Sequence, residues 1–340
     1  MNETSTKRLR QADIAAKAGV SVSTVSRVLA NEPGISDAIR QQIFKVAAEL
    51  GYPLKSAQAA TSGALALIAS DSATGGLSVF YEGILDGLRT GSVERGMPFD
   101  VRLVREARMS SENVQDYLRT AEADGLFLVG IDPSDELRAW LEESSTPVVL
   151  VNGTDPKLRF DGVSPSNFFG AYEATNRLIA AGHRRILHVT GSHRHTIRER
   201  VRGFETAVAS VEGGEGRLVR LSFHGSASQE AHAATLKALA ENPGFTAAFC
   251  MNDFIAVGVL DAVSEIGRRV PEDFAIVGFD DLPCALMTNP RLATMRVDRA
   301  ALGREAVGLM ISRFRDRSAP ARQICHAVVP VPGGTLPNES

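Results

Sequence analysis

Cysteine is scarce in this sequence of 340 residues, which contains only Cys250, Cys284 and Cys325. The three are far apart and match neither the paired spacing of a zinc site nor the framework of a disulfide-rich secreted domain. The simplest interpretation is three reduced thiols in a cytoplasmic protein that binds no structural metal.

Long apolar runs are also missing. No segment approaches the roughly 20 apolar residues of a membrane helix, and the first ten residues, MNETSTKRLR, lead into no apolar secretory signal. With 44% hydrophobic and 23% charged residues, the composition is typical of a soluble globular protein. A chain of this length is expected to form two or three domains and has no evident partner in a membrane.

Motifs of common α/β enzymes are absent too. No GxGxxG opens a helix after a strand, and GxxxxGK[ST], HExxH and GxSxG do not occur. Among seven histidines the only close pair is His193-x-His195, which indicates a loop rather than a metal site. We therefore expect no enzyme activity, no cofactor and no metal.

A helix-turn-helix pattern extends from Gln11 to Leu29, QADIAAKAGVSVSTVSRVL. Two apolar helical faces flank Gly19, which supplies a left-handed turn. The first face holds Ile14, Ala15 and Ala18, and the second holds Val22, Val25, Val28 and Leu29. Two helices this poor in large apolar residues cannot bury a core alone, so residues 36–51 are predicted to form a third wall. Its apolar positions are Ile35, Ile39, Ile43, Val46, Ala47 and Leu50.

Ser21 stands at the N-cap position of the second predicted helix. The residues on the first turns of such a helix face a DNA groove. We expect Val22 and Ser23 to contact base edges and Arg27 to contact a base or a nearby phosphate. Thr24 and Ser26 are expected to contact the DNA backbone. From spacing alone, a helical subdomain with hydroxyls on a solvated face stays the alternative.

Charge is divided unevenly along the chain. Residues 1–63 carry a net charge of +3, whereas the whole chain carries −3, so the remainder is acidic. A basic N-terminal segment suits contact with phosphates, and the acidic remainder of the chain favours solubility.

From Gly63 onward, short apolar runs alternate with amphipathic helical stretches, which is typical of a parallel sheet with crossover helices. A polar break at residues 153–166 divides the predicted strands four and four, favouring two Rossmann-like lobes over one large sheet. The strands are residues 64–69, 99–104, 125–129, 148–151, 186–190, 218–221, 247–251 and 274–278.

Residues 12–52 resemble the DNA-binding domain of LacI-type transcriptional repressors, with AGVS, TVSRVL and ELGY at that family's places. Arg10 departs from the family, which usually has a capping threonine there. NFFGAYEATNRLIAAGHRRILHVTG, RVRGF, AAFCMND and RRVPEDFAIVGFDDLP are similar to the family's effector-binding core, which shares its fold with periplasmic sugar-binding proteins.

The resemblance implies an α/β protein with an N-terminal three-helix DNA-binding domain and a periplasmic-binding-protein-like core. It places the DNA-binding domain at residues 1–52 and a hinge segment at 53–63. The first lobe comprises residues 64–161 and 291–320, and the second 162–290 and 321–340. In the hinge we expect Lys55 and Gln58 to contact DNA, while the leucine that the family inserts into the minor groove is missing.

The resemblance also implies the effector contacts. Arg200 matches the family's effector-clamping arginine, Asn252 and Asp280 match polar groups of the second lobe, and Asp71 and Asn152 follow strands of the first. As alternatives, Asn252 and Asp280 cap the following helices and Arg200 is a surface charge. Paired donors and acceptors are what a hydroxylated ligand requires.

Arginine is concentrated in SHRHTIRERVR, which supplies Arg194, Arg198, Arg200 and Arg202. Either most of them face solvent, with Glu199 neutralising one, or Arg200 and one of Arg194 and Arg198 reach an effector that carries a carboxylate or phosphate.

We therefore expect a DNA-binding transcriptional regulator, most simply a repressor, that binds a pseudo-palindromic operator as a homodimer. A small effector, a carbohydrate or a carbohydrate acid or phosphate, is expected between the lobes. A transport binding protein is the alternative with the same core, but it needs a signal peptide and has no use for a helix-turn-helix.

Overall fold

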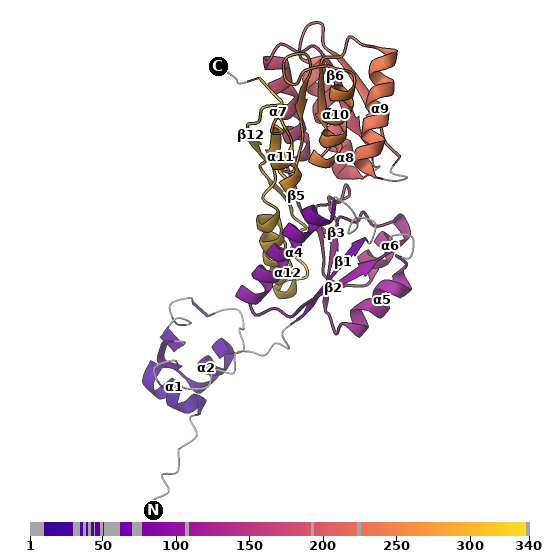
Figure 1. Cartoon of the computed structure of the whole chain (residues 1–340). Coiled ribbons are helices and arrows are strands. Elements are labelled where there is room, and N and C mark those ends of the chain that lie inside the picture. Colours follow the sequence, from indigo (N-terminus) through magenta and orange to yellow (C-terminus); the bar gives the residue numbers. More distant parts are fainter. Residues whose placement is uncertain are drawn as a thin grey trace, which may run out of the picture. The chain divides into compact units, whose positions relative to one another are not determined.

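The computed structural model describes residues 10–29, 35–36, 39, 42–43, 45–47, 50, 62–69, 77–105, 109–191, 194–222 and 226–337 (Figure 1). The chain forms two compact units, residues 1–62 and 63–340.

The first unit is a small helical bundle. Helices α1 (Gln11–Ala18) and α2 (Val22–Leu29) flank Gly19, whose φ of 67° is left-handed as predicted. The predicted three-walled core is confirmed for the described side chains, because residues of the third segment pack with both helices. The buried cluster contains Ile14, Ala15, Ala18, Val25, Val28, Ile43, Val46 and Ala47. The prediction was wrong for Val22, which is 48% exposed rather than part of the apolar face.

Arg10 is the N-cap residue of α1, but its side chain makes no capping hydrogen bond. Instead the backbone N–H of Arg10 donates to Asp13 Oδ2 over 2.6 Å. This is the reciprocal half of a capping box. It satisfies the Arg10 N–H but does not replace the side-chain cap that the family's usual threonine would supply.

The second unit begins with a six-stranded parallel sheet in the order β11-β5-β4-β3-β1-β2. Its strands are β1 (Ala64–Ala69), β2 (Phe99–Val104), β3 (Gly125–Val129), β4 (Val148–Val151), β5 (Asp161–Pro165) and β11 (Gln323–His326). Alternate residues of β1 enter different buried clusters, Leu65 and Leu67 on one face and Ala66 and Ile68 on the other. The helices of this lobe are α4 (Leu77–Glu94), α5 (Ser111–Thr120), α6 (Asp135–Glu143) and α12 (Arg299–Arg315).

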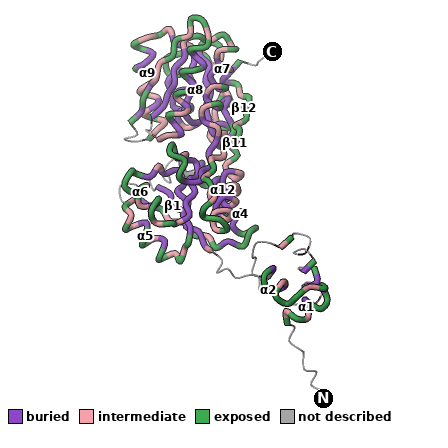
Figure 2. The backbone as a smooth tube through the Cα atoms, turned by 180° about the vertical axis from the view of Figure 1, so that it is seen from behind, coloured by how far each residue is buried: buried purple, intermediate pink, exposed green. Residues whose placement is uncertain are grey.

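A four-stranded parallel sheet, β7-β6-β8-β9, forms the second lobe. Its strands are β6 (Arg185–Thr190), β7 (Glu215–Arg220), β8 (Ala247–Cys250) and β9 (Ala275–Val277). The helices are α7 (Asn167–Ala180), α8 (His195–Ala209), α9 (Ala227–Glu241), α10 (Asp253–Glu265) and the short α11 (Pro283–Met287). In Figure 2 the inner strands of both sheets are buried, whereas the edge strands β2, β7 and β11 and the outer helices carry exposed residues.

All eight predicted strands are present with small shifts at their ends, and they divide four and four between the two sheets as predicted. The first sheet contains two further strands that the sequence analysis missed. β5 (DGVSP) and β11 (QICH) extend the first sheet, so residues 162–165 and 323–326 pair with strands of the first lobe. Neither segment has the apolar run of a buried strand. Asp161 is nevertheless fully buried at the start of β5, because it accepts hydrogen bonds from the Arg313 side chain and the Arg322 backbone.

Two short antiparallel strands, β10 (Thr294–Arg296) and β12 (Val329–Val331), complete the structure. Beyond β12, Thr335 is buried: its hydroxyl donates to the carbonyl of Ile276 and accepts from the backbone N–H of Ala293. The final described residues therefore pack against β9. Between Arg315 and residue 337 the structure contains no further helix.

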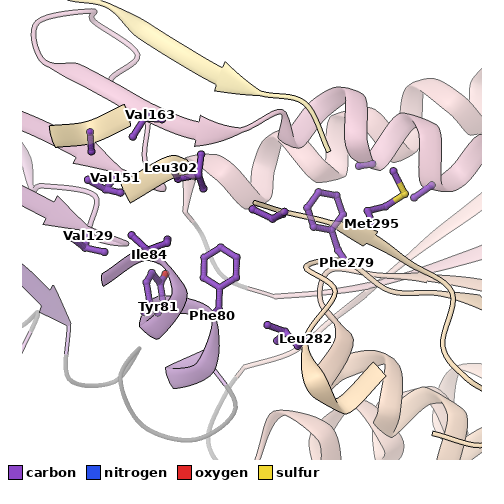
Figure 3. Packing of buried hydrophobic residues seen from close by; sticks show 14 of the residues in the cluster. Phe80, Tyr81, Ile84, Val129, Val151, Val163, Phe279, Leu282, Met295 and Leu302 are labelled. Atoms are coloured by element: carbon purple, nitrogen blue, oxygen red, sulfur yellow. The ribbon is translucent and has the colours of Figure 1, made fainter. Parts of the chain in front are cut away.

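One buried hydrophobic cluster extends through both lobes (Figure 3). It joins Phe80 and Tyr81 at the start of α4 to Phe279 and Leu282, which follow β9. Phe80 and Tyr81 pack edge to face with their centroids 5.3 Å apart. The lobes thus share a continuous apolar connection. Of the helices that the structure describes, none has the length and apolar character to cross a membrane.

The close packing of α4 against α12 depends on glycine. A Cβ at Gly87 would lie 2.1 Å from the carbonyl oxygen of Ala300, whereas a Cβ at Gly308 would meet nothing within 4 Å. Because backbone cannot move aside cheaply, Gly87→Ala is expected to lower the free energy of unfolding by about 2 to 3 kcal/mol. Gly308→Ala should be neutral or stabilising by up to about 1 kcal/mol, since alanine favours helix. Urea unfolding measures both; equal effects would contradict this packing.

Candidate functional site

The predicted DNA-reading residues lie on one helix of the first unit. Ser21 caps α2 as expected, because its Oγ accepts the backbone N–H of Thr24 over 3.0 Å and lies 2.7 Å from the Thr24 hydroxyl. Val22, Ser23, Ser26 and Arg27 are exposed, and Thr24 is half-buried. Helix α2 therefore presents an apolar side chain, hydroxyls and a guanidinium to its surroundings. Lys55 and Gln58 lie outside the described residues.

In the second unit, the candidate effector residues follow the carboxyl ends of strands. Asn152 follows β4, Asn252 follows β8 and Asp280 follows β9, while Arg200 lies on α8. All four are buried. Ligands bind at this edge of open α/β sheets. Asp71, the fifth candidate, lies outside the described residues.

The guanidinium of Arg200 has three hydrogen-bond partners and packs on an aromatic ring. Its Nε donates to Asn167 Oδ1 over 2.8 Å, its Nη1 to the carbonyl oxygen of Met251, and its Nη2 to Asp280 Oδ1 over 3.5 Å. The guanidinium carbon also lies 3.7 Å from the ring centroid of Phe279. Arg200 is therefore a buried, charge-paired group and not a surface charge.

Asp280 is the buried counter-charge of Arg200. Burial raises its pKa to about 6, and the guanidinium groups of Arg200 and Arg299 limit the rise. Its backbone φ is 105°, and its N–H donates to the carbonyl of Met295. The carboxylate is thus placed by a left-handed turn that is hydrogen-bonded to β10.

Asn252 takes the helix-capping role that the sequence left open as an alternative to effector contact. Its Oδ1 accepts the backbone N–H of Ile255 over 3.0 Å and caps α10. Only the oxygen takes part in this cap, so the amide N–H donors are outside that bond.

Asn152 reaches toward α4. Its Nδ2 donates to the hydroxyl of Tyr81 over 3.4 Å. Its Oδ1 is buried and has no hydrogen-bond partner among the described parts of the protein. Leaving such an acceptor unpaired costs about 1 to 3 kcal/mol, so this atom is suited to a ligand that donates.

Arg194 connects the two lobes. Its Nη1 donates to the Tyr81 hydroxyl over 3.1 Å, and its Nη2 to the carbonyl of Asn152 over 2.6 Å and to Asp132 Oδ1 over 3.4 Å. Asp132 Oδ2 in turn accepts the backbone N–H of His195 over 2.9 Å. Our sequence interpretation missed Asp132, although it comes shortly after β3 at the same sheet edge that indicated Asn152.

The remaining arginines of this segment face solvent. Arg198 is exposed, and Arg202 donates to both carboxylate oxygens of Glu199 at 2.7 and 2.8 Å. Glu199 therefore neutralises Arg202. Two ion pairs of described residues lie near this sheet edge, Arg200 with Asp280 within the second lobe and Arg194 with Asp132 across the two lobes.

A hollow of about 380 Å³ lies elsewhere, at the amino ends of β4 and β5. Arg313 on its wall is engaged with Asp161 and with the carbonyls of Arg317 and Ala319. It lies at the sheet edge opposite the one where α/β proteins bind ligands. No group of three or more metal-ligating side chains occurs within the described ranges.

Two family profiles match the chain. Bacterial regulatory proteins of the lacI family match residues 12–53, and a periplasmic binding protein-like domain matches residues 175–336. Among curated proteins, the transcriptional regulator CelR of Thermobifida fusca is 30% identical over 321 residues, 92% of this chain and 94% of the relative. The repressor PurR of Aliivibrio fischeri is 26% identical over 321 residues, 91% of this chain and 93% of the relative.

Solved structures agree with this fold. The complex of CelR with cellobiose has a TM-score of 0.69 at 26% identity and covers 96% of this chain and 100% of that chain. The lac repressor dimer bound to operator and an anti-inducer has a TM-score of 0.68 at 23% identity, with 97% and 99% covered. The fold predicted from the sequence is confirmed.

Two arginines of α8 provide a matched test of the buried pair. Arg200→Gln leaves Asp280 without its close guanidinium and is expected to cost about 3 to 5 kcal/mol of stability. Arg202→Gln breaks an ion pair whose arginine side chain is 65% exposed and should cost less than about 1 kcal/mol. Chemical unfolding of both variants measures the difference. Similar costs would mean that the Arg200 pair is not structurally coupled to the core.

Proposed function

Because the chain belongs to the LacI family of bacterial transcriptional regulators, we propose that it is a repressor controlled by a neutral sugar or sugar derivative bound between its lobes. Its DNA-binding role follows from the family and from the capped, exposed face of α2. The observation that supports the class of effector is the charge pairing between the lobes together with the buried Asn152 Oδ1.

The argument for a neutral effector has two steps. Arg200 and Arg194 each have their own carboxylate, so an anion would have to displace an internal partner. The buried Asn152 Oδ1 needs a donor, which a hydroxyl supplies and a carboxylate or phosphate does not. Of the two interpretations of the arginine-rich segment, these observations favour the solvent-facing one for Arg198 and Arg202.

The effector contacts we propose are Arg200, Asn252, Asp280, Asn152 and Asp71. Arg200 offers a planar donor fork, Asn252 an amide, and Asp280 a carboxylate that accepts from hydroxyl groups. The cellobiose in the structure of CelR makes this disaccharide a suitable first probe.

Control of transcription then follows from the connection between the lobes. Effector binding would change the angle between them and so the spacing of the two DNA-binding units in a homodimer. Coupling of this kind is typically about 1 to 3 kcal/mol. A dimer would place two α2 helices in successive major grooves of a pseudo-palindromic operator, and its location would be the cytoplasm.

The docking of α2 is tested by substitution. Arg27→Ala is expected to cost about 1 to 3 kcal/mol of operator affinity if Arg27 contacts a base. The double variant with Ser23→Ala should lose sequence preference as well. Gel shifts with operator and scrambled DNA measure both effects. Unchanged binding by the double variant would show that α2 docks differently.

The pKa of Asp280 gives effector binding a pH dependence. Hydroxyl groups bind the ionised carboxylate, so proton and sugar compete; affinity should fall as the pH drops from 7 through about 6 toward 5. Titration calorimetry with cellobiose, or with another sugar found by thermal-shift screening, measures this. In Asp280→Asn, which cannot ionise, the affinity should be weaker and independent of pH. A pH dependence that persists in this variant would exclude Asp280 as its source.

A further inference from the structure

Asp132 has an unusual position for a capping residue. Helix α8 begins in the second lobe after Arg194, whose side chain does not cap it. The first backbone N–H of the helix instead donates to Asp132 Oδ2, a carboxylate of the first lobe, over 2.9 Å. The helix is capped from across the space between the lobes.

The groups that hold this carboxylate are those of an anion site. The N-terminus of a helix carries a partial positive charge and unpaired N–H groups, and it favours carboxylate or phosphate. Arg194 adds a full positive charge, with its Nη2 3.4 Å from Asp132 Oδ1. The same guanidinium is fixed by Tyr81 and by the carbonyl of Asn152, so it is held in place without Asp132.

We propose that Asp132 determines the charge of the effector, because its carboxylate occupies the position that an acidic or phosphorylated sugar would otherwise take. This inference rests on the proposed sugar-responsive function and adds the residue that decides between neutral and anionic ligands. Arg200 does not determine the charge of the effector, because its own partner Asp280 is almost completely buried beside it.

The site is open enough for exchange. The side chains of Arg194 and Asp132 are 21% and 30% exposed, whereas those of Arg200 and Asp280 are each 5% exposed. A small anion can therefore reach Arg194 and the start of α8 once the internal carboxylate is removed. Asp132→Ala removes the internal carboxylate that occupies this position.

The test uses the full-length protein without DNA and inorganic phosphate as the anionic probe, with sodium chloride at equal ionic strength as reference. Thermal shift and calorimetry measure phosphate affinity. Asp132→Ala should bind phosphate about tenfold more tightly than the unsubstituted protein. Asp132→Asn, whose amide oxygen can still cap the helix, should show a smaller gain.

Two controls separate this site from a general change of charge. Asp116→Ala removes one carboxylate from an exposed pair with Arg119 on α5 of the same lobe and should leave phosphate affinity unchanged. Adding Arg194→Gln to Asp132→Ala should abolish the gain. Equal phosphate affinity with and without Asp132, the same gain in Asp116→Ala, or a gain that survives loss of Arg194 would each overturn the inference.

A panel of neutral sugars, cellobiose included, is titrated against the unsubstituted protein in parallel. If no neutral sugar binds while Asp132→Ala still gains phosphate affinity, the proposed effector is wrong and the role of Asp132 stands. If a neutral sugar binds but Asp132→Ala gains nothing, the proposed function stands and the role of Asp132 is wrong.

Discussion

Charge compensation between the lobes is the constraint on which the core depends. A guanidinium taken out of water without a partner is costly, and removing one member of a buried pair costs several kcal/mol. The second lobe nevertheless places Arg200 in its interior and Arg194 at the boundary. Each arginine has a carboxylate partner, Asp280 for Arg200 and Asp132 for Arg194. Both carboxylates lie shortly after the end of a strand, which fixes their positions.

The placement of Asp280 depends in turn on a second buried carboxylate. Asp253 accepts the backbone N–H of Leu282 over 2.7 Å and the hydroxyl of Thr294 over 2.6 Å, which fixes the turn that carries Asp280. A Cβ at Gly278 would lie 2.2 Å from Asp253 Oδ1, so this position requires glycine. Burial raises the pKa of Asp253 well above its usual value, and the nearby Asp280 adds to the rise.

A shared hydrophobic cluster connects the two lobes in addition to their polar contacts. Phe80 and Tyr81 of the first lobe belong to the same buried cluster as Phe279 and Leu282 of the second. Tyr81 also receives hydrogen bonds from Asn152 and Arg194 through its hydroxyl. A change in the angle between the lobes would therefore alter the packing and the hydrogen bonds of one tyrosine together, which suits an element that transmits effector binding.

Much of the fold and of the candidate site could be predicted from the sequence, and the elements that were missed have physical reasons. Apolar runs located eight strands, and the Ser21 cap and the turn at Gly19 were predicted from local residue chemistry. β5 and β11 were missed because neither DGVSP nor QICH has the apolar run of a typical buried strand.

Arg194 was named without a partner because the contact with Asp132 joins residues 62 positions apart. The rule that indicated Asn152, a polar residue after a buried strand, applies equally to Asp132. The sequence left open whether Arg194 or Arg198 turns inward, because this depends on a carboxylate, Asp132, that only the folded chain brings near.

The salt dependence of effector affinity tests the central claim, that paired charges between the lobes receive a neutral ligand. Calorimetry with the sugar identified by screening is carried out at about 0.1 M and about 1 M sodium chloride, between which the Debye length falls from roughly 10 Å to roughly 3 Å. The dissociation constant of a neutral sugar should change less than about twofold, while operator affinity, measured alongside, falls steeply. A sugar affinity that weakens tenfold or more over this range would contradict the account, because it would mean that the ligand binds through uncompensated charge.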